Sequence, residues 1–154
     1  MSDSDKTTIN DPIKTHRQYA LVLGYAGAAV IPALLVLALL TPDIAGPIRR
    51  VSVIYGGAIL AFLGGIQWGF SLTCSNPRVQ LRRLVVSMVP PLWSVAALSL
   101  PLNICTLLLI SGLSLLLVYE WLERGNDGYP DWYLPLRLQL TTALAVGLGL
   151  TMLL

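Results

Sequence analysis

Residues 51–72, VSVIYGGAILAFLGGIQWGFSL, form a continuous stretch without a charged side chain. About 20 apolar residues in a helix cross the hydrocarbon core of a bilayer, so this stretch is long enough to span a membrane. It nevertheless contains five glycines and one amide, Gln67. Small residues and polar side chains in a transmembrane helix are typical of close packing against other helices.

The composition of the whole chain points the same way. Of 154 residues, 55% are hydrophobic and only 12% are charged, whereas about a quarter of the residues in soluble domains are charged. A soluble chain of this length has too little interior to bury so much apolar surface. The composition therefore predicts an integral membrane protein.

Four further stretches are long enough to span a bilayer: 19–40, 84–100, 102–122 and 134–154. The run from Leu84 to Tyr119 contains no charged residue and is too long for a single span, so it must contain two helices. Pro101 and Asn103 divide it, since proline ends one helix and asparagine caps the next. The sequence therefore predicts an all-α protein with five transmembrane helices.

The basic residues predict the orientation. With the N-terminus in the cytoplasm, only Arg49 and Arg50 of the ten Lys and Arg residues lie outside. This distribution follows the positive-inside rule. The eight residues expected inside are Lys6, Lys14, Arg17, Arg78, Arg82, Arg83, Arg124 and Arg137.

The first 18 residues form a polar segment that precedes the membrane domain of residues 19–154. The apolar run after this segment is too long for the core of a signal peptide, and Asp3, Asp5 and Asp11 are unusual in a mitochondrial presequence. We expect residues 1–18 to be an uncleaved, disordered cytoplasmic tail. We also expect the protein to lie in a bacterial inner membrane.

Small residues recur every four positions in the second span, at Gly57, Ala61, Gly65 and Gly69. At 100° per residue they form one stripe, with Gly64 and Trp68 on the same side of the helix. The first span carries a similar series, and we expect the two spans to pack through these stripes. A hinge or a permeation path is the functional alternative. The series in the first span is Ala20, Gly24, Ala28 and Pro32.

Gln67 projects from the edge of the small stripe rather than from its opposite side. A buried amide requires a hydrogen-bond partner. We expect an interhelical hydrogen bond, and a contact with a substrate or partner protein is the alternative. For Trp68, a packing role over Gly64 and Gly65 and an interfacial anchor are both consistent with the sequence.

Tandem prolines, Pro90 and Pro91, interrupt the third span. Because proline lacks an amide hydrogen, the carbonyls of Val86 and Ser87 lose their helical partners, which predicts a kink or an unwound turn. Broken helices mark substrate sites in many transporters. Ordinary kinks also occur, and hydroxyls such as those of Ser87 and Ser94 can satisfy the freed carbonyls.

The connection between the fourth and fifth spans gathers aromatic and charged residues, which is typical of a membrane interface. Arg137 lies a few residues inside the fifth span. It either extends to the surface or pairs with Glu120 or Asp131, and an ionisable residue at this depth is a functional candidate. The aromatic residues are Tyr119, Trp121, Tyr129, Trp132 and Tyr133, and the acids are Glu120, Glu123, Asp127 and Asp131.

Several kinds of chemistry have no counterpart in the sequence. His16 is the single histidine, and Cys74 and Cys105 are expected on opposite sides of the membrane. No cysteine pair has the spacing of a metal site, and no glycine pattern resembles a nucleotide-binding loop. We therefore expect no catalytic residues, no metal, no cofactor and no nucleic-acid partner.

Three segments together resemble a known family: YGGAILAFLGGIQWGFSL in the second span, RRLVVSMVPPLW in the third and YPDWYLPLRLQLT at the fifth. The chain is similar to the domain-of-unknown-function 3429 family from about Tyr19 to its end. The resemblance implies a small membrane protein of bacteria and mitochondria that spans the bilayer several times and has no settled activity.

Three classes of function remain open. The first is a non-enzymatic accessory, assembly or scaffold protein of a membrane complex, with the bilayer and other membrane proteins or a second copy as partners. The second is a small oligomeric transporter or channel whose path is lined by Gln67, Arg137 and the broken third span. The third is an intramembrane enzyme, which the residues support least.

Overall fold

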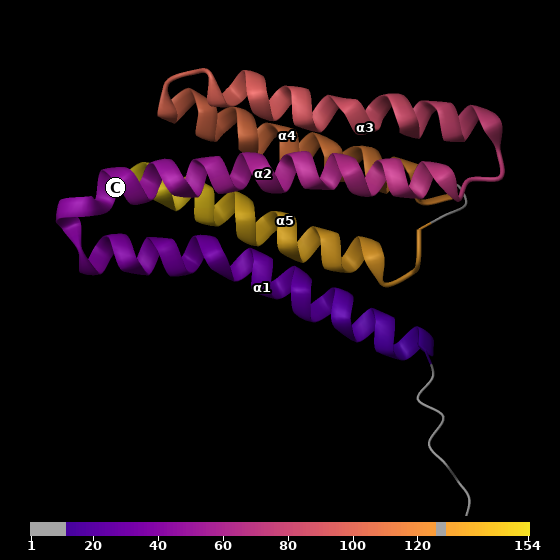
Figure 1. Ribbon diagram of the computed structural model, residues 1–154, viewed down its shortest axis with the longest axis horizontal. Coiled ribbons are helices and arrows are strands. Elements are labelled where there is room, and N and C mark those ends of the chain that lie inside the picture. Colours follow the sequence, from indigo (N-terminus) through magenta and orange to yellow (C-terminus); the bar gives the residue numbers. More distant parts are fainter. Residues whose placement is uncertain (1–11, 126–128) are drawn as a thin grey trace, which may run out of the picture.

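The computed structural model describes residues 12–125 and 129–154, and in these ranges the chain is almost entirely helical (Figure 1). The long helices are α1 (Pro12–Leu40), α2 (Ala45–Leu72), α3 (Pro77–Leu98), α4 (Leu102–Leu122) and α5 (Tyr133–Leu150). Three single turns of 3-10 helix accompany them: η1 (Pro42–Ile44), η2 (Glu123–Gly125) and η3 (Thr151–Leu153). Five of the described helical segments are long and apolar enough to cross a membrane, which confirms the predicted spans.

The helix boundaries differ from the predicted ones for local reasons. Helix α1 begins at Pro12, so residues 12–18 are helical and do not form the disordered tail that we expected, while residues 1–11 lie outside the described ranges. Helix α3 begins seven residues early, because Asn76 caps its first turn by accepting a hydrogen bond from the Arg78 amide (3.0 Å) and Pro77 suits the first helical position.

The turn between α3 and α4 also differs in detail from the prediction. Helix α4 begins at Leu102 after Pro101, and no side chain caps it. Asn103 therefore lies inside the helix, and its side-chain oxygen accepts a hydrogen bond from the Arg49 guanidinium of α2. The residue that was predicted as a cap instead joins two helices at this end of the bundle.

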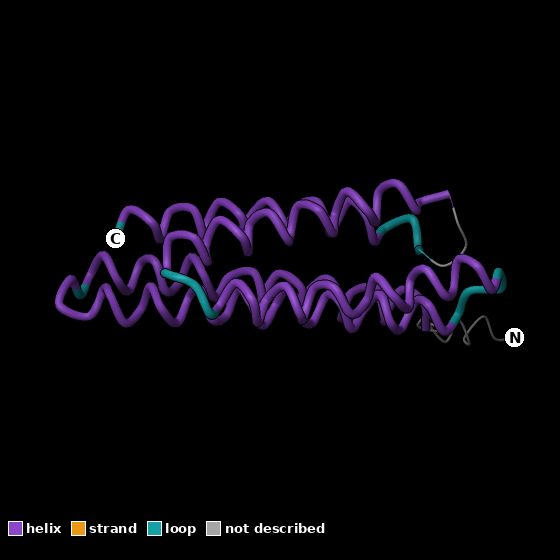
Figure 2. Tube along the Cα trace, turned by 90° about the horizontal axis from the view of Figure 1, so that it is seen from above, coloured by secondary structure: helices purple, strands orange, loops and turns teal. Residues whose placement is uncertain are grey.

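The five helices run side by side in two layers. Figure 2 shows α1, α2 and α3 in one layer and α4 and α5 in the other, and α2 packs most extensively on α3. The N-terminal half of α1 diverges from the other helices (Figure 1). Helix α2 is in contact with all four other long helices, so its residues are the most constrained in the fold.

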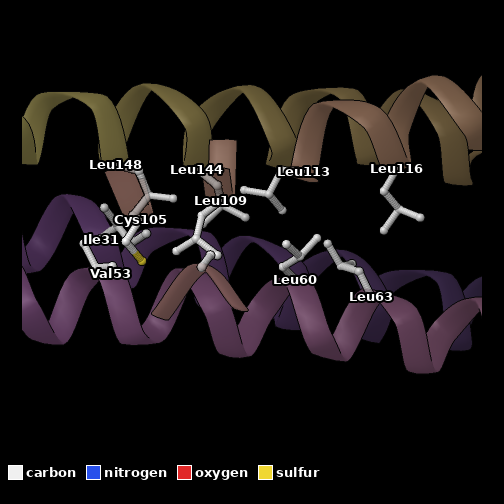
Figure 3. Close-up of a cluster of buried hydrophobic side chains, with 11 residues drawn as sticks. Ile31, Val53, Leu60, Leu63, Cys105, Leu109, Leu113, Leu116, Leu144 and Leu148 are labelled. Atoms are coloured by element: carbon white, nitrogen blue, oxygen red, sulfur yellow. The ribbon is translucent and has the colours of Figure 1, made fainter. Parts of the chain in front are cut away.

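The interior is filled by aliphatic side chains from all the helices (Figure 3). Leu60 of α2, Leu109 and Leu113 of α4 and Leu148 of α5 are completely buried. Small residues let the helices approach each other: a Cβ atom at Gly147 would lie 2.8 Å from Ile31 Cγ2, and one at Gly112 would lie 2.7 Å from Leu60 Cδ2. Many large apolar side chains point outward, as expected for helices that face lipid.

Candidate functional site

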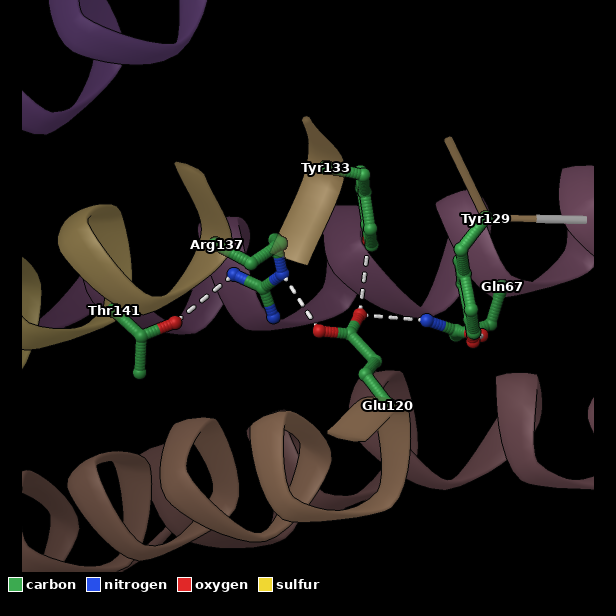
Figure 4. A network of polar contacts seen from close by, with 6 residues as sticks. All are labelled: Gln67, Glu120, Tyr129, Tyr133, Arg137 and Thr141. Atoms are coloured by element: carbon green, nitrogen blue, oxygen red, sulfur yellow. Dashed lines mark hydrogen bonds and ion pairs between the residues drawn. The ribbon is translucent and has the colours of Figure 1, made fainter. Parts of the chain in front are cut away.

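A network of buried polar side chains joins α2, α4 and α5 near the end of the bundle that carries the α2–α3 turn (Figure 4). Gln67 of α2 is completely buried. Its amide nitrogen donates a hydrogen bond to Glu120 Oε1 (2.6 Å), and its amide oxygen accepts one from the Tyr129 hydroxyl (2.7 Å). Both ends of the amide are therefore used within the chain, and the expected interhelical hydrogen bond is present.

Glu120 is the centre of the network. It lies in the last turn of α4, and its side chain is completely buried. Besides Gln67, its carboxylate accepts hydrogen bonds from the Tyr133 hydroxyl (2.9 Å) and from Arg137 Nε (2.9 Å). The charge of Arg137 offsets the cost of burying the carboxylate, and together with the two neutral donors it occupies three of its roughly four acceptor sites.

Arg137 pairs with Glu120, one of the two acids predicted for it, and does not extend to the surface. Only 2% of Arg137 is exposed. Its Nη1 donates to the hydroxyl of Thr141 (3.0 Å), which lies one turn further along α5 and thus on the same face. Its Nη2 is buried and has no hydrogen-bond partner among the described residues.

Aromatic rings cover the network on the side of the α4–α5 connection. The rings of Tyr129 and Tyr133 are stacked with centroids 5.3 Å apart, and the edge of Phe70 meets both. The guanidinium of Arg83, which is completely buried, lies 4.5 Å from the centre of the Tyr129 ring. Burial raises the pKa of Tyr129 above its ordinary value of 10.0, so its hydroxyl stays protonated, and able to donate to Gln67, at a higher pH than that of an exposed tyrosine.

A second ion pair lies next to this network. Arg82 Nη2 donates to Glu123 Oε2 (2.7 Å), with the arginine half exposed and the glutamate nearly buried. Arg83 also donates to the sulfur of Cys74 (3.0 Å). These contacts connect the N-terminal part of α3 to the end of α4 and to the end of α2.

Some residues of the predicted interfacial motif lie outside the network. Asp131 is exposed, and Trp132 is half buried with its ring edge-on to Tyr133. Trp68 is 43% exposed, and no atom lies within 4 Å of a Cβ atom at Gly65, so Trp68 does not cover that glycine. Glu120, Tyr133, Arg137 and Gln67 are thus the predicted residues that the fold brings together.

The predicted small stripe of α2 does not pack as a unit on α1. A Cβ atom at Gly65 or Gly69 would meet nothing within 4 Å, and Ala61 is only half buried. Gly57 faces Leu98 of α3, where a Cβ atom would lie 3.0 Å from Leu98 Cδ1. Gly57 of the stripe thus packs on α3, and its neighbour Gly56 packs on Leu148 of α5, whereas Gly65 and Gly69 of the stripe face open space.

Gly64 makes the tightest of these contacts, and it does so with the tandem prolines. A Cβ atom at Gly64 would lie 2.6 Å from the carbonyl oxygen of Ser87 and 2.9 Å from Pro91 Cδ. Pro91 cannot donate to the Ser87 carbonyl, so that oxygen is free to face α2. The absent side chain of Gly64 gives it the necessary space.

The prolines do not unwind α3, which was one of the two predicted outcomes. The helix continues from Pro77 to Leu98 without interruption. The serines also have other partners than predicted, because Ser87 donates to the Leu84 carbonyl (2.7 Å) and Ser94 donates to the Pro90 carbonyl (2.9 Å). Neither hydroxyl satisfies the carbonyls of Val86 and Ser87.

Sequence reasoning did not identify Tyr129, Thr141 and Arg83 as members of the buried cluster. The spacing of Arg137 and Thr141, one helical turn, was a usable signal. In the sequence, Arg83 was counted only among the basic residues that predict the orientation. Tyr129 was counted only among the aromatic residues of the membrane interface. In the part of the chain that the structure describes, no group of three His, Cys, Asp or Glu residues is placed to hold a metal ion.

Comparison with known proteins identifies relatives among vertebrate membrane proteins. The chain is 34% identical over 138 residues to transmembrane protein 69 of Mus musculus, covering 88% of this chain and 56% of the relative. It is 34% identical over 125 residues to transmembrane protein 69 of Xenopus tropicalis, covering 79% of this chain and 49% of the relative. The chain thus spans about half the length of the curated relatives that it matches.

No solved structure matches the chain. The profile of a family described as "Protein of unknown function (DUF3429)" matches residues 16–153, which is nearly the whole sequence. Together with five helices of membrane-spanning length, these matches identify a multi-pass membrane protein that belongs to the DUF3429 family.

Proposed function

We propose that this protein is a non-enzymatic accessory, assembly or scaffold protein of a membrane complex, located in a bacterial inner membrane. The way in which Glu120 is held carries this proposal. Three donors from two helices, on Gln67, Tyr133 and Arg137, engage its carboxylate, which is sealed from solvent. Groups held in this way fasten helices to each other and are not free to act on a substrate.

The outer surface of the bundle also supports a role in assembly. Phe62 of α2 is 64% exposed, and α1 buries little of its length against the other helices. In a bilayer such surfaces are available to lipid or to helices of another protein. A rigid interior with a large apolar exterior suits a protein that works through lateral contacts.

Affinity purification from the native membrane tests the proposal. The tagged protein is extracted in mild detergent, and co-purifying proteins are quantified by mass spectrometry. A membrane protein recovered in a fixed ratio is the expected result. Recovery of the chain alone, as a homo-oligomer, contradicts the accessory function.

Two adjacent glycines provide the control for this experiment. A leucine at Gly64 collides with α3, whereas a leucine at Gly65 enters open space. A genuine assembly partner is expected with the folded Gly65→Leu variant and not with Gly64→Leu. A protein that co-purifies with both variants is not an assembly partner, because it also binds the misfolded Gly64→Leu chain, as chaperones and proteases do.

One observation favours a second function, that of a small oligomeric transporter or channel. Glu120 and Arg137 form an ion pair inside candidate spans, and Arg137 Nη2 has no hydrogen-bond partner among the described residues. Ionisable groups in such positions form proton relays in many transporters. Proton flux into liposomes, followed with a trapped pH-sensitive dye, tests this function: a transporter acidifies the lumen, and its Glu120→Gln variant does not.

A further inference from the structure

A groove of about 220 Å³ lies between α3 and α4, on the outer surface of the bundle. Val89 of α3 and Leu115 of α4 line it and are more than half exposed, so it is open toward the surrounding lipid. Its lining is almost wholly apolar. The groove is smaller than the roughly 300 Å³ at which pockets for drug-sized molecules begin, so a narrow chain fits it better than a ring system.

The floor of the groove is fixed. The indole nitrogen of Trp93 donates to the carbonyl of Leu108 across the α3–α4 interface (2.8 Å). Gly112 supports the ring from beneath, since a Cβ atom there would lie 2.9 Å from Trp93 Cδ1. Because Trp93 is held in place from both sides, the groove exists without a ligand.

One end of the groove is polar. The hydroxyl of Tyr119 is buried there, and no described residue accepts its proton. The carboxylate of Glu123 and the guanidinium groups of Arg82 and Arg83 interact electrostatically with this hydroxyl, and Arg82 lies close enough to donate a hydrogen bond to its oxygen. Two positive charges and one negative charge surround it, so an acceptor oxygen that carries a negative charge suits this position.

We propose that this groove binds an anionic phospholipid. One acyl chain lies along the groove from Tyr119 to Trp93, and an oxygen of the glycerol phosphate accepts hydrogen bonds from Tyr119 and from the half-exposed Arg82. The rise along α4 from Gly112 to Tyr119 is about 10 Å, a length that accommodates the first part of an acyl chain. Basic pockets between transmembrane helices are suited to lipid head groups.

Native mass spectrometry of the full chain in a non-ionic detergent tests the proposal. The protein is titrated with phosphatidylglycerol, which is anionic, or with diacylglycerol, which has the same acyl chains and no phosphate. We expect the first phosphatidylglycerol to bind about tenfold more tightly, as is typical of a charged hydrogen bond. Equal affinity for the two lipids overturns the assignment of an anionic head group.

Matched tryptophan substitutions test the place of the acyl chain. Val89→Trp fills the groove, and Val85→Trp adds the same bulk one turn away at a similarly exposed position outside the lining. We expect Val89→Trp to abolish tight binding of the first phosphatidylglycerol and Val85→Trp to retain it. Leu115→Trp with Leu107→Trp as its control repeats the test on α4, and unchanged binding by both groove variants overturns the proposal.

Two further variants test the polar end. Tyr119→Phe removes only the hydroxyl, and we expect the affinity for phosphatidylglycerol to fall about two- to tenfold. Arg82→Gln is expected to abolish the preference for phosphatidylglycerol, while Arg124→Gln, whose guanidinium lies over Trp121, retains it. If Arg124→Gln loses the preference for phosphatidylglycerol and Arg82→Gln keeps it, the head group binds at a different surface, and the proposal is contradicted.

Discussion

Arg137 Nε lies 2.9 Å from Glu120 Oε2, and both side chains are almost completely excluded from solvent. The pair joins the last turn of α4 to the first turns of α5 across a connection that contains Tyr129 and the exposed Asp131. A buried charge that loses its partner is costly, so this pair makes the relative position of the two helices sensitive to single substitutions.

Arg137→Ala is therefore expected to destabilise the protein by about 3–5 kcal/mol, because it leaves the Glu120 carboxylate buried without its cation. Thermal unfolding in detergent measures the loss. Asp131→Ala is the control, since Asp131 is exposed and lies outside the network. A double-mutant cycle with Glu120→Gln and Arg137→Gln should show strong coupling, and additive effects would refute a direct pair.

Gly64→Ala and Gly65→Ala are expected to differ sharply although the residues are adjacent. The methyl group at Gly64 would collide with the Ser87 carbonyl and Pro91, and overpacking of this kind costs about 1–3 kcal/mol. The methyl group at Gly65 enters open space, so stability should change little. Accumulation in the membrane and the melting temperature report both effects. Equal destabilisation by the two variants would contradict the packing of Gly64 against α3 and the exposure of Gly65.

Tyr129→Phe keeps the ring stack but leaves the buried oxygen of Gln67 without its donor. We expect a loss of about 1–3 kcal/mol at pH 7, and Tyr25→Phe, which removes a hydroxyl from an exposed hydrogen bond, serves as the control. An unchanged melting temperature for Tyr129→Phe would show that the hydrogen bond contributes nothing.

The same tyrosine predicts a pH dependence. Its pKa is higher in the folded protein than the unperturbed value of 10.0, so above pH 10 the unfolded chain releases a proton that the folded chain keeps. Stability should therefore fall as the pH rises above 10, and Tyr129→Phe should show a shallower fall. Unfolding curves of both proteins between pH 8 and pH 11 measure the difference. Identical slopes would exclude a contribution from Tyr129.

The orientation in the membrane remains a prediction from charge. A green fluorescent protein fused to the N-terminus should fluoresce, and alkaline phosphatase fused after Leu154 should be active, because the charge distribution places the N-terminus inside and the C-terminus outside. Fusions at the α2–α3 turn, next to Arg78, provide an internal check, since this turn is expected inside. An active phosphatase at that turn would reverse the orientation.

The sequence was sufficient for the number of helices and for their approximate ends. Runs of apolar residues and the break at Pro101 are local features, and the fold follows them. The start of α3 at Pro77, seven residues before the predicted one, was not identified. The direction in which each helix packs was harder to predict. Transmembrane helices are apolar on every side, so periodicity does not distinguish the face of Gly64 from that of Gly65, which lies 100° further round the helix.

Part of the polar site was predictable from the sequence. The burial of Gln67 and the pairing of Arg137 follow from the cost of placing polar groups in lipid. Gln67 and Arg137 both bind the carboxylate of Glu120. This shared contact was not predictable, because it depends on the packing of α2, α4 and α5, which lie far apart in the sequence. Tyr129 joins them through its contact with the Phe70 ring and its hydrogen bond to Gln67, which a local pattern does not predict.

The position of Glu120 at the centre of the network has a consequence for biosynthesis. Gln67 enters the membrane 53 residues before its partner Glu120 is made, and Glu120 precedes its cation Arg137 by 17 residues. Helices inserted in order of synthesis would hold an unsatisfied amide and then an unneutralised carboxylate until the fifth segment arrives. Insertion of the segment that carries Arg137 is thus expected to complete the network, and a chain truncated before Arg137 should leave the Glu120 carboxylate without its cation.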